Sequence, residues 1–355
     1  MEGRPAAGRG GGNGAPTIRD IAREAGVSRA TVSLVLQDSP LVADRTRERV
    51  RSTMARLRYR PSRMAASLRS KRSFILGLIV SDLTWPHYAQ MAAGIERAVE
   101  GAGYSLLVAN SHDSAERERR HVENLGRYRA DGGIVAPVRP TAGEVEHLRA
   151  LAAEGFPLVT LFRDVRGLAV DHCGIDVYGV TRRLVAHLAE ELGHRRVALV
   201  TTAMPNSTNP ARLEGWRDEL RARGLPAGDE LVAFTAPGTQ PRAAGERAVA
   251  ELLERRVRPT AIVCVNDFLA LGALRGLQRA GVTVPGQMSV AGMSGFEELS
   301  PPHQALTTVH TDYRRLGAEA GALLLRRIAD PAAPAERRLV EATLRPGEST
   351  STAPS

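Results

Sequence analysis

The chain has 355 residues, of which 43% are hydrophobic and 25% are charged, values typical of a globular protein of two or three domains. It has no run of about 18 apolar residues, the length of a membrane span, and its first residues lack the apolar stretch of a secretion signal. Its two cysteines, Cys173 and Cys264, are too few for a disulfide framework and lack the spacing of zinc ligands. We therefore expect a soluble cytoplasmic protein.

The net charge of +9 is concentrated at one end of the chain. Residues 1–72 carry a net charge of +10, whereas the rest of the chain carries a net charge of −1. This distribution is typical of a module that binds a polyanion and is attached to a nearly neutral body. A basic tail kept only for solubility would have low complexity, and within the basic region only the glycine-rich residues 1–16 fit that description; we expect them to form a disordered tail.

Residues 17–60 show helical periodicity. Thr17 and Asp20 have the spacing of a helix N-cap pair, and Gly26 is a residue type that readily ends a helix. Ser28 is a natural N-cap for a second helix. The apolar faces of the two helices are formed by Ile18, Ile21, Ala22, Ala25, Val32, Val35 and Leu36. Two short helices joined by a tight turn indicate a helix-turn-helix, although a generic three-helix bundle with a solvated basic face has the same pattern.

A third helix is predicted from about Asp44 to Leu57. Its buried face would contain Val50, Met54 and Leu57, and Pro61 limits its continuation. Its outer face carries Arg45, Arg47, Arg49, Arg51, Arg56 and Arg58. Such an arginine-rich face suits a polyanionic partner.

The run TIRDIAREAGVSRATVSLVL resembles, nearly position by position, the DNA-binding headpiece of the lac repressor and purine repressor (LacI/GalR) family. The similarity continues through VADRTRERVRSTMARLRYRPS and SRMAASLRS. In this family the second helix enters the major groove of double-stranded DNA with its N-terminal end first. The resemblance implies base contacts from Arg29, Ala30 and Leu34, and Arg29 can form a forked hydrogen bond to guanine. Short hydroxyl side chains suited to phosphate oxygens, or to capping the helix, are Thr17, Ser28, Thr31 and Ser33.

The segment from Ser62 to Ser70, within a predicted hinge helix or linker at 61–72, resembles the hinge helix of the same family. A helix of fewer than about ten residues is not stable alone in water, so it should form only when paired with its two-fold mate on DNA. In the family, the residue that matches Leu68 inserts into a central base step from the minor groove and kinks the duplex. The alternative is that Leu68 is an ordinary apolar linker residue, but the matching AASL sequence favours the wedge.

From Phe74 onward, short apolar runs alternate with helical stretches. The strand candidates are FILGLIV, YSLLVAN, DGGIVAP, PLVTLF, RVALVTT, AIVCVN and MSVAGM. The alternation predicts an α/β core with parallel sheets covered on both faces, in two lobes. This region resembles the family's periplasmic-binding-protein-like core, in which the chain crosses between lobes three times. The resemblance implies an effector-binding and dimerisation core at 73–350, with lobe one at 73–174 and 310–333, lobe two at 175–309 and 334–350, a strand near Arg337–Leu344 in lobe two, and a tail at 351–355.

Ligands of open α/β sheets bind beyond the carboxyl ends of the strands, which here is the cleft between the lobes. Arg212 matches the family's ligand-binding arginine and can fork onto sugar hydroxyls or a carboxylate; the alternative is a surface ion pair with Glu214 or Asp218. Asn266 and Asp267 match a segment that faces the cleft, or they only cap the following helix. The full set of predicted effector contacts is His87, Tyr88, Phe162, Arg163, Arg212, Phe234, Asn266, Asp267 and Ser294.

Ser294 marks a departure from the family. Relatives that bind sugars usually have Gly-Phe/Tyr-Asp-Asp where this chain has Gly292-Met293-Ser294-Gly295. A neutral hydroxyl thus replaces the carboxylate that would hold sugar hydroxyls. We therefore expect either an unusual effector or weak effector control.

Together these patterns predict a sequence-specific transcriptional regulator, in the first instance a repressor, that binds a palindromic operator as a homodimer. A small-molecule effector, a sugar or related metabolite, would modulate its affinity for DNA. The tail after Leu344 has no leucine heptads, which favours a dimer over a tetramer.

Nothing in the sequence indicates an enzyme. The nine histidines form no HExxH or other metal pattern, no nucleophile is paired with a base, and we expect no cofactor, metal or membrane contact. Two alternatives stay open: a solute-binding or sugar-processing protein with a basic extension, and an architectural protein that binds DNA without sequence preference.

Overall fold

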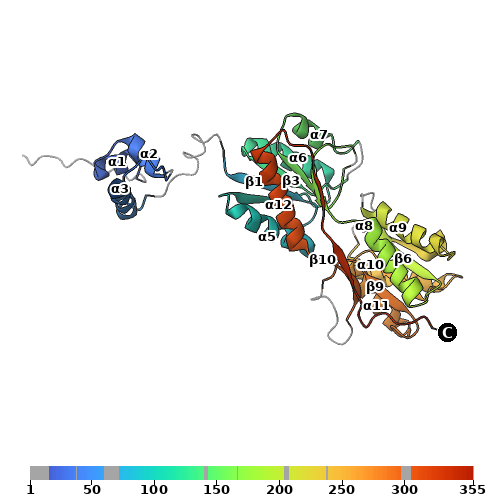
Figure 1. The fold of residues 1–355 in the computed structure, drawn as a ribbon. Coiled ribbons are helices and arrows are strands. Elements are labelled where there is room, and N and C mark those ends of the chain that lie inside the picture. The colour runs from blue at the N-terminus through green and yellow to red at the C-terminus, as the bar shows by residue number, and fades with distance from the viewer. Residues whose placement is uncertain are drawn as a thin grey trace, which may run out of the picture. The chain divides into compact units, whose positions relative to one another are not determined.

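The computed structural model describes residues 16–36, 38–59, 72–139, 143–165, 167–203, 208–236, 239–296 and 305–354. The chain divides into two compact units, Met1–Ser73 and Phe74–Ser355 (Figure 1). The predicted N-terminal tail and the segment that contains Leu68 lie outside the described residues. Among the helices that are described, none is both long enough and apolar enough to cross a membrane.

The N-terminal unit folds as three helices around a small apolar core. They are α1 (Ile18–Ala25), α2 (Arg29–Leu36) and α3 (Asp44–Arg56). The predicted capping pair is confirmed, because Thr17 and Asp20 each accept a hydrogen bond from the other's backbone N–H. Gly26 ends α1 in the left-handed conformation, with φ of 62°. The buried core residues are Ile21, Ala22, Ala25, Val32, Val35, Val42 and Val50.

One arginine of α3 faces inward, contrary to the prediction. The guanidinium of Arg47 is largely buried and donates hydrogen bonds to the carbonyls of Ser39 (2.8 Å) and Val42 (3.2 Å). These carbonyls belong to the loop between α2 and α3, which has no helical partners for them, so the long arginine side chain reaches back to satisfy them. On the outer face, Arg56 pairs with Glu24 of α1 at 3.1 Å.

Among the described residues, the second unit forms two six-stranded sheets. The first sheet has the order β11-β5-β4-β3-β1-β2 with parallel pairs throughout, and we call this sheet with its helices lobe one. Its strands are β1 (Ile75–Val80), β2 (Ser105–Asn110), β3 (Gly132–Val135), β4 (Leu158–Leu161), β5 (Asp171–Gly174) and β11 (Arg337–Leu339). The second sheet, in lobe two, has the order β12-β10-β9-β8-β6-β7, and only the β10–β12 pair is antiparallel. Its strands are β6 (Val197–Thr202), β7 (Val232–Thr235), β8 (Ala261–Cys264), β9 (Ser289–Gly292), β10 (Thr307–Thr311) and β12 (Ala342–Arg345).

The predicted α/β architecture in two lobes is confirmed, with helices on both faces of the first sheet (Figure 1). Helices α5 (Pro86–Glu100) and α12 (Tyr313–Ala329) pack with Leu76 and Leu78 of β1, whereas α6 (Ala115–Arg127) and α7 (Glu146–Ala153) pack with Ile79 on the opposite face. The helices and short helical turns of lobe two are α8 (Val177–Ala186), η1 (His187–Glu191), α9 (Thr208–Ala222), η2 (Asp229–Leu231), α10 (Pro241–Glu254) and α11 (Asp267–Arg279). Both cysteines are buried within strands, in β5 and β8.

Three connections join the lobes: β5 leads into α8, β10 leads into α12, and β11 leads into β12. The single strand predicted near Arg337–Leu344 in lobe two is therefore wrong. Its first part, β11, pairs with β5 in lobe one, and only β12 pairs with β10 in lobe two. The chain covers the otherwise open edge of β5 before it crosses, which satisfies the backbone groups of that edge.

The last residues are held against lobe two, although we predicted a tail at 351–355. Ser349 is fully buried, and its carbonyl accepts the backbone N–H of Val290 at 2.8 Å. The backbone N–H of Ala353 donates to the carbonyl of Leu192 at 2.7 Å. Small hydroxyl-bearing residues in this segment allow such close backbone docking.

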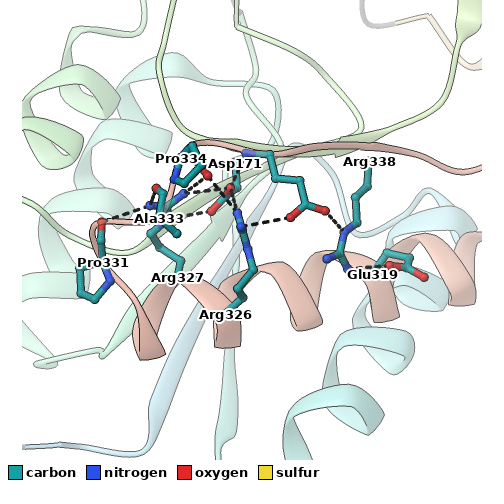
Figure 2. Close-up of polar contacts among 9 residues, drawn as sticks. Asp171, Glu319, Arg326, Arg327, Pro331, Ala333, Pro334 and Arg338 are labelled. Atoms are coloured by element: carbon teal, nitrogen blue, oxygen red, sulfur yellow. Dashed lines mark hydrogen bonds and ion pairs between the residues drawn. The ribbon is translucent and has the colours of Figure 1, made fainter.

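Asp171 connects three segments of lobe one (Figure 2). Its buried carboxylate, at the start of β5, accepts hydrogen bonds from Arg326 at 2.8 Å and from Nε and Nη2 of Arg327 at 2.8 and 3.1 Å. It also accepts the backbone N–H of Glu336, just before β11, at 2.7 Å. Burial acts to raise the pKa of Asp171, but the hydrogen bonds and the two guanidinium charges outweigh it and lower the pKa below its usual value. The carboxylate thereby fixes β11 beside β5, at the start of the third crossing.

We expect Asp171→Asn to lower the free energy of unfolding of the full chain by about 2–3 kcal/mol, because a forked charge pair is lost while both guanidiniums keep some contact with water. Because the pKa of Asp171 is lowered in the folded state, its carboxylate contributes its full stabilisation at pH values above the unfolded-state pKa. This contribution is lost as the pH falls through the native pKa, so the difference from wild type should shrink below about pH 4. Urea unfolding at a series of pH values measures both effects. The exposed Glu341→Gln serves as a control, with an expected change under about 0.5 kcal/mol. Equal losses in the two variants would contradict the role of Asp171.

Candidate functional site

Helix α2 presents its first residues to solvent. The Oγ of Ser28 accepts the backbone N–H of Thr31 at 3.0 Å and lies 2.9 Å from the Thr31 hydroxyl, so Ser28 caps the helix as predicted. Arg29 and Ala30, two of the predicted base contacts, are exposed. Leu34, the third, is half-buried and packs against the core of the N-terminal unit, so only part of its side chain faces solvent.

Two further residues predicted to contact phosphates are less available. The hydroxyl of Thr17 is exposed but donates to the carboxylate of Asp20 at 2.7 Å, within the capping box of α1. Ser33 is half-buried in α2. A phosphate contact from Thr17 would therefore compete with its own helix cap.

Exposed arginines give the N-terminal unit a positive surface. Four of its arginines pair with acidic residues inside the unit, as Arg56 does with Glu24. Within the described part of this unit, the arginines that make no ion pair are Arg19, Arg29, Arg45, Arg49 and Arg58. Unpaired guanidiniums of this kind suit the phosphates of a nucleic acid.

A cavity of about 660 Å³ lies between the two lobes at the carboxyl ends of their strands, the position expected for a ligand. The predicted effector contacts that line it are His87, Tyr88, Phe162, Arg163, Arg212, Asn266 and Ser294. The sequence prediction missed further charged, amide and aromatic lining residues, namely Asp82, Trp85, Asp113, Asn209, Arg242, Phe268 and Tyr313.

Aromatic rings form one wall of the cavity. The His87 ring lies 4.3 Å from Tyr88, 5.5 Å from Phe162 and 5.4 Å from Tyr313, measured between centroids. Burial, together with the nearby charges of Arg163 and Arg212, lowers the pKa of His87 to about 3, so this imidazole is neutral at physiological pH.

An aromatic contact also joins the two lobes. Trp85 of lobe one meets Phe268 of lobe two edge to face, with centroids 5.5 Å apart. Offset and edge-on ring pairs of this kind are favourable.

Arg212 lies inside the cavity and not in a surface ion pair with Glu214 or Asp218. Its side chain stands on α9, and the residue is only 9% exposed. Nη1 donates to Asn209 at 3.3 Å, while the buried Nε has no hydrogen-bond partner. Burial and the charge of Arg163 lower the pKa of Arg212 to about 10, which still leaves it charged at neutral pH.

Arg163 approaches the same cavity from lobe one. It follows β4, and its Nη1 donates to the carbonyls of Pro137 (3.1 Å) and Val138 (3.2 Å). Its buried Nε has no hydrogen-bond partner. The two carbonyls fix the side chain and leave its other edge available.

Asp113 is one of the two acidic lining residues that the sequence prediction missed. It lines the cavity, and its buried Oδ1 has no hydrogen-bond partner. Burial raises the pKa of Asp113, and the charge of Arg163 opposes this rise. The residue follows β2 by three positions, so the rule that ligands bind beyond strand ends was the signal that could have found it.

Asn266 and Asp267 have different roles. Asn266 lines the cavity and also caps α11, because its Oδ1 accepts the backbone N–H of Leu269 at 2.9 Å. Asp267 is fully buried outside the lining; it accepts the backbone N–H groups of Ser294 (3.1 Å) and Phe296 (2.9 Å). The carboxylate thus holds the segment that carries Ser294, behind the cavity wall.

Phe234 also lies outside the cavity lining. It is 51% exposed on β7, an edge strand of lobe two, whereas the next residue, Thr235, lines the cavity. Because side chains alternate along a strand, an offset of one residue directs the ring away from the cavity.

The sequence and the fold both match known regulators. The model for bacterial regulatory proteins of the lacI family matches residues 17–62, and a periplasmic binding protein-like domain matches residues 185–350. The chain is 32% identical over 310 residues to the transcriptional regulator GalR of Salmonella typhimurium strain SL1344, a match that covers 87% of this chain and 88% of GalR. The chain belongs to the lacI family of bacterial regulatory proteins.

Other lacI-family members show the same extent of similarity. The repressor PurR of Proteus mirabilis strain HI4320 is 29% identical over 320 residues, covering 88% of this chain and 90% of PurR. The lac repressor dimer bound to operator and the anti-inducer ONPF has a TM-score of 0.85 at 28% identity and covers 95% of this chain and 100% of its own. A complex of the transcriptional regulator CelR with cellobiose has a TM-score of 0.69 at 28% identity, over 94% of this chain and 99% of its own. This lacI-family protein is thus a DNA-binding transcriptional regulator with a helix-turn-helix headpiece and a two-lobed core.

We expect Asp267→Ala to lower the free energy of unfolding of this lacI-family protein by about 3 kcal/mol, because it leaves the buried N–H of Phe296 and the Thr308 hydroxyl without an acceptor and removes one of the two acceptors of the Ser294 N–H. The matched control is Asp176→Ala, which removes an exposed carboxylate that caps α8 and should cost about 1 kcal/mol. Denaturant unfolding monitored by tryptophan fluorescence compares them. If the exposed cap costs as much as the buried carboxylate, Asp267 does not hold the Ser294 segment in the way described.

Proposed function

We propose that this protein is a repressor that binds a palindromic operator as a homodimer and changes its affinity for DNA when a small metabolite binds between its lobes. The exposed start of α2, capped by Ser28 and carrying the unpaired Arg29, is the observation that supports DNA binding most directly. A dimer with two-fold symmetry requires an operator with matching symmetry, and the lac repressor to which this chain is similar was solved as a dimer on operator.

On DNA, Arg29 would read a guanine and Ala30 would contact a base methyl group, with a smaller apolar contribution from the exposed part of Leu34. The hydroxyls of Ser28, Thr31, Ser33 and Thr17 would contact phosphates and set the register, and Ser28 can do so while it caps α2. Leu68 would act as the minor-groove wedge between two paired hinge segments. The protein would act in the cytoplasm, where bacterial operators lie.

The cavity would bind the effector, a sugar or related metabolite, through Arg212, Arg163 and Asn266, with further contacts from His87, Tyr88, Phe162 and Ser294. Phe234 and Asp267 do not line the cavity, so we omit them from the proposed contacts. We propose no catalytic role, because the cavity offers guanidinium and amide groups for binding, and His87, the one histidine among its described lining residues, is neutral and buried among aromatic rings. Among the described residues, no three His, Cys, Asp or Glu side chains lie together as a metal site.

Arg29→Ala should weaken binding to the preferred operator by about 1–3 kcal/mol and relax selectivity at one base pair of each half-site, because a forked hydrogen bond to guanine is lost. The preferred operator is first obtained by selection from random duplexes, and affinities are then measured on it and on random duplex at fixed salt. The control is Arg49→Ala, an exposed arginine of α3 without an ion pair, which should weaken binding to both duplexes to the same extent.

Equal losses on operator and random duplex for Arg29→Ala would contradict its role in base recognition. If the wild-type protein binds every duplex alike, with a steep dependence on salt, it is an architectural DNA-binding protein, and if it binds none, it is a solute-binding protein with a basic extension.

A further inference from the structure

The cavity contains two guanidinium groups that come from opposite lobes. Arg163 follows β4 of lobe one, and Arg212 stands on α9 of lobe two. Each has a buried Nε without a hydrogen-bond partner. Neither makes an ion pair within 4.0 Å with any carboxylate of the described residues. Two like charges therefore face one space with their hydrogen-bonding capacity only partly used.

The two carboxylates that line the cavity among the described residues form no ion pair with these guanidiniums. Asp82 is half-buried and accepts the N–H and hydroxyl of Thr84 at 3.0 and 2.8 Å, so its carboxylate is used locally. Asp113 feels the charge of Arg163 but lies beyond ion-pair distance, and Arg242 is exposed to water. Neither lining carboxylate thus pairs with Arg163 or Arg212, and both guanidiniums keep unused hydrogen-bond donors.

Ser294 supplies no further counter-charge. It lies in the cavity lining and contributes only a neutral hydroxyl. A ligand that carries no charge would leave both guanidiniums without a directly paired oxyanion, which is costly for groups withdrawn from water.

We propose that the effector is a small polyhydroxylated anion whose carboxylate or phosphate group lies between Arg163 and Arg212 and bridges the two lobes. The inference rests on the proposed function, since it names the ligand class of the same cavity. Guanidinium groups bind both oxyanions through forked, charge-assisted hydrogen bonds. The unpartnered Oδ1 of Asp113 accepts a ligand hydroxyl, and the rings of Trp85 and Phe268 contact the apolar face of the ligand.

In this arrangement, an anion bound to both guanidiniums stabilises the closed lobes. Arg163 and Arg212 repel one another across the cavity when no anion lies between them, and an anion that contacts both converts the repulsion into two attractions. The gain exists only when both lobes are near the anion, so the ligand has a higher affinity for the closed arrangement than for the open one. Differential affinity of this kind is what a change in DNA binding requires.

Isothermal titration calorimetry of the full chain tests the proposal with four probes at equal ionic strength: glucose, glucuronate, glucose 6-phosphate and inorganic phosphate. We expect glucuronate or glucose 6-phosphate to bind at least about tenfold more tightly than glucose, and comparison of these two identifies the preferred oxyanion. Inorganic phosphate should bind weakly at the same place and compete with the preferred probe.

Arg163→Gln should reduce the preference for the anion over glucose to less than about threefold, and Arg163→Lys should retain part of it, because the charge stays but the fork is lost. The matched control is Arg247→Gln, which removes an exposed arginine of α10 that does not line the cavity and should leave the preference intact. Circular dichroism checks that each variant is folded.

Three results would overturn the proposal: glucose binding as tightly as the anions, none of the three anions binding to the wild type, or Arg163→Gln keeping the full preference. Operator affinity without any probe is measured on the same samples. If operator binding is normal while the anions fail, only the ligand class is wrong; if selective operator binding fails, the proposed function is wrong.

Discussion

The buried positive charge of Arg212 is the constraint on which the rest of the two-lobed unit depends. A guanidinium nine-tenths withdrawn from water remains charged, because even a pKa lowered to about 10 stays well above neutral pH. Its Nη1 has the amide of Asn209 as a partner, and its Nε has none. Such a group is stabilised best by an acceptor brought in from outside the chain, and this is why the cavity around it is suited to a ligand.

The architecture can transmit the effect of a ligand bound at Arg212 from the cavity to the DNA-binding unit. Each lobe contributes one of the two guanidiniums that have an unpartnered buried Nε, and three chain crossings are the covalent connections between the lobes. Asp171 fixes the last crossing on the side of lobe one by tying β5, α12 and β11 together (Figure 2). The DNA-binding unit is joined to lobe one by the chain before Phe74, so a change in lobe one can alter how two such units are held.

The sequence predicted those features that depend on local chemistry. The capping pair Thr17 and Asp20, the stop at Gly26 and the cap at Ser28 are all present, because the partners lie within a few residues of one another. The apolar strand runs correspond to strands for the same reason. The prediction missed β5, whose residues Asp171 and His172 are polar; there, pairing with Arg326, Arg327 and Thr160 satisfies side chains that are rare in a buried strand.

Features set by long-range contacts were not predictable. The chain near Val340 changes sheets because β5 offers an open edge, and this edge is more than 160 positions away in the sequence. Arg47 turns inward to reach loop carbonyls that a helical wheel does not show. Most of the effector contacts predicted from the resemblance do line the cavity. Two do not: Asp267 binds backbone amides behind the cavity wall, and Phe234 is directed outward by an offset of one residue along its strand. Asp113 was missed because its role arises from burial beside Arg163, which only the folded chain creates.

Linkage between the cavity and DNA tests the central claim most directly. The affinity of the full-length protein for the preferred anion is measured with and without saturating operator, and its affinity for operator is measured with and without saturating anion. The account predicts that the two ratios are equal and differ from one by at least about fivefold, since coupling between two sites is reciprocal. An affinity for the anion that is the same on and off operator would contradict the account.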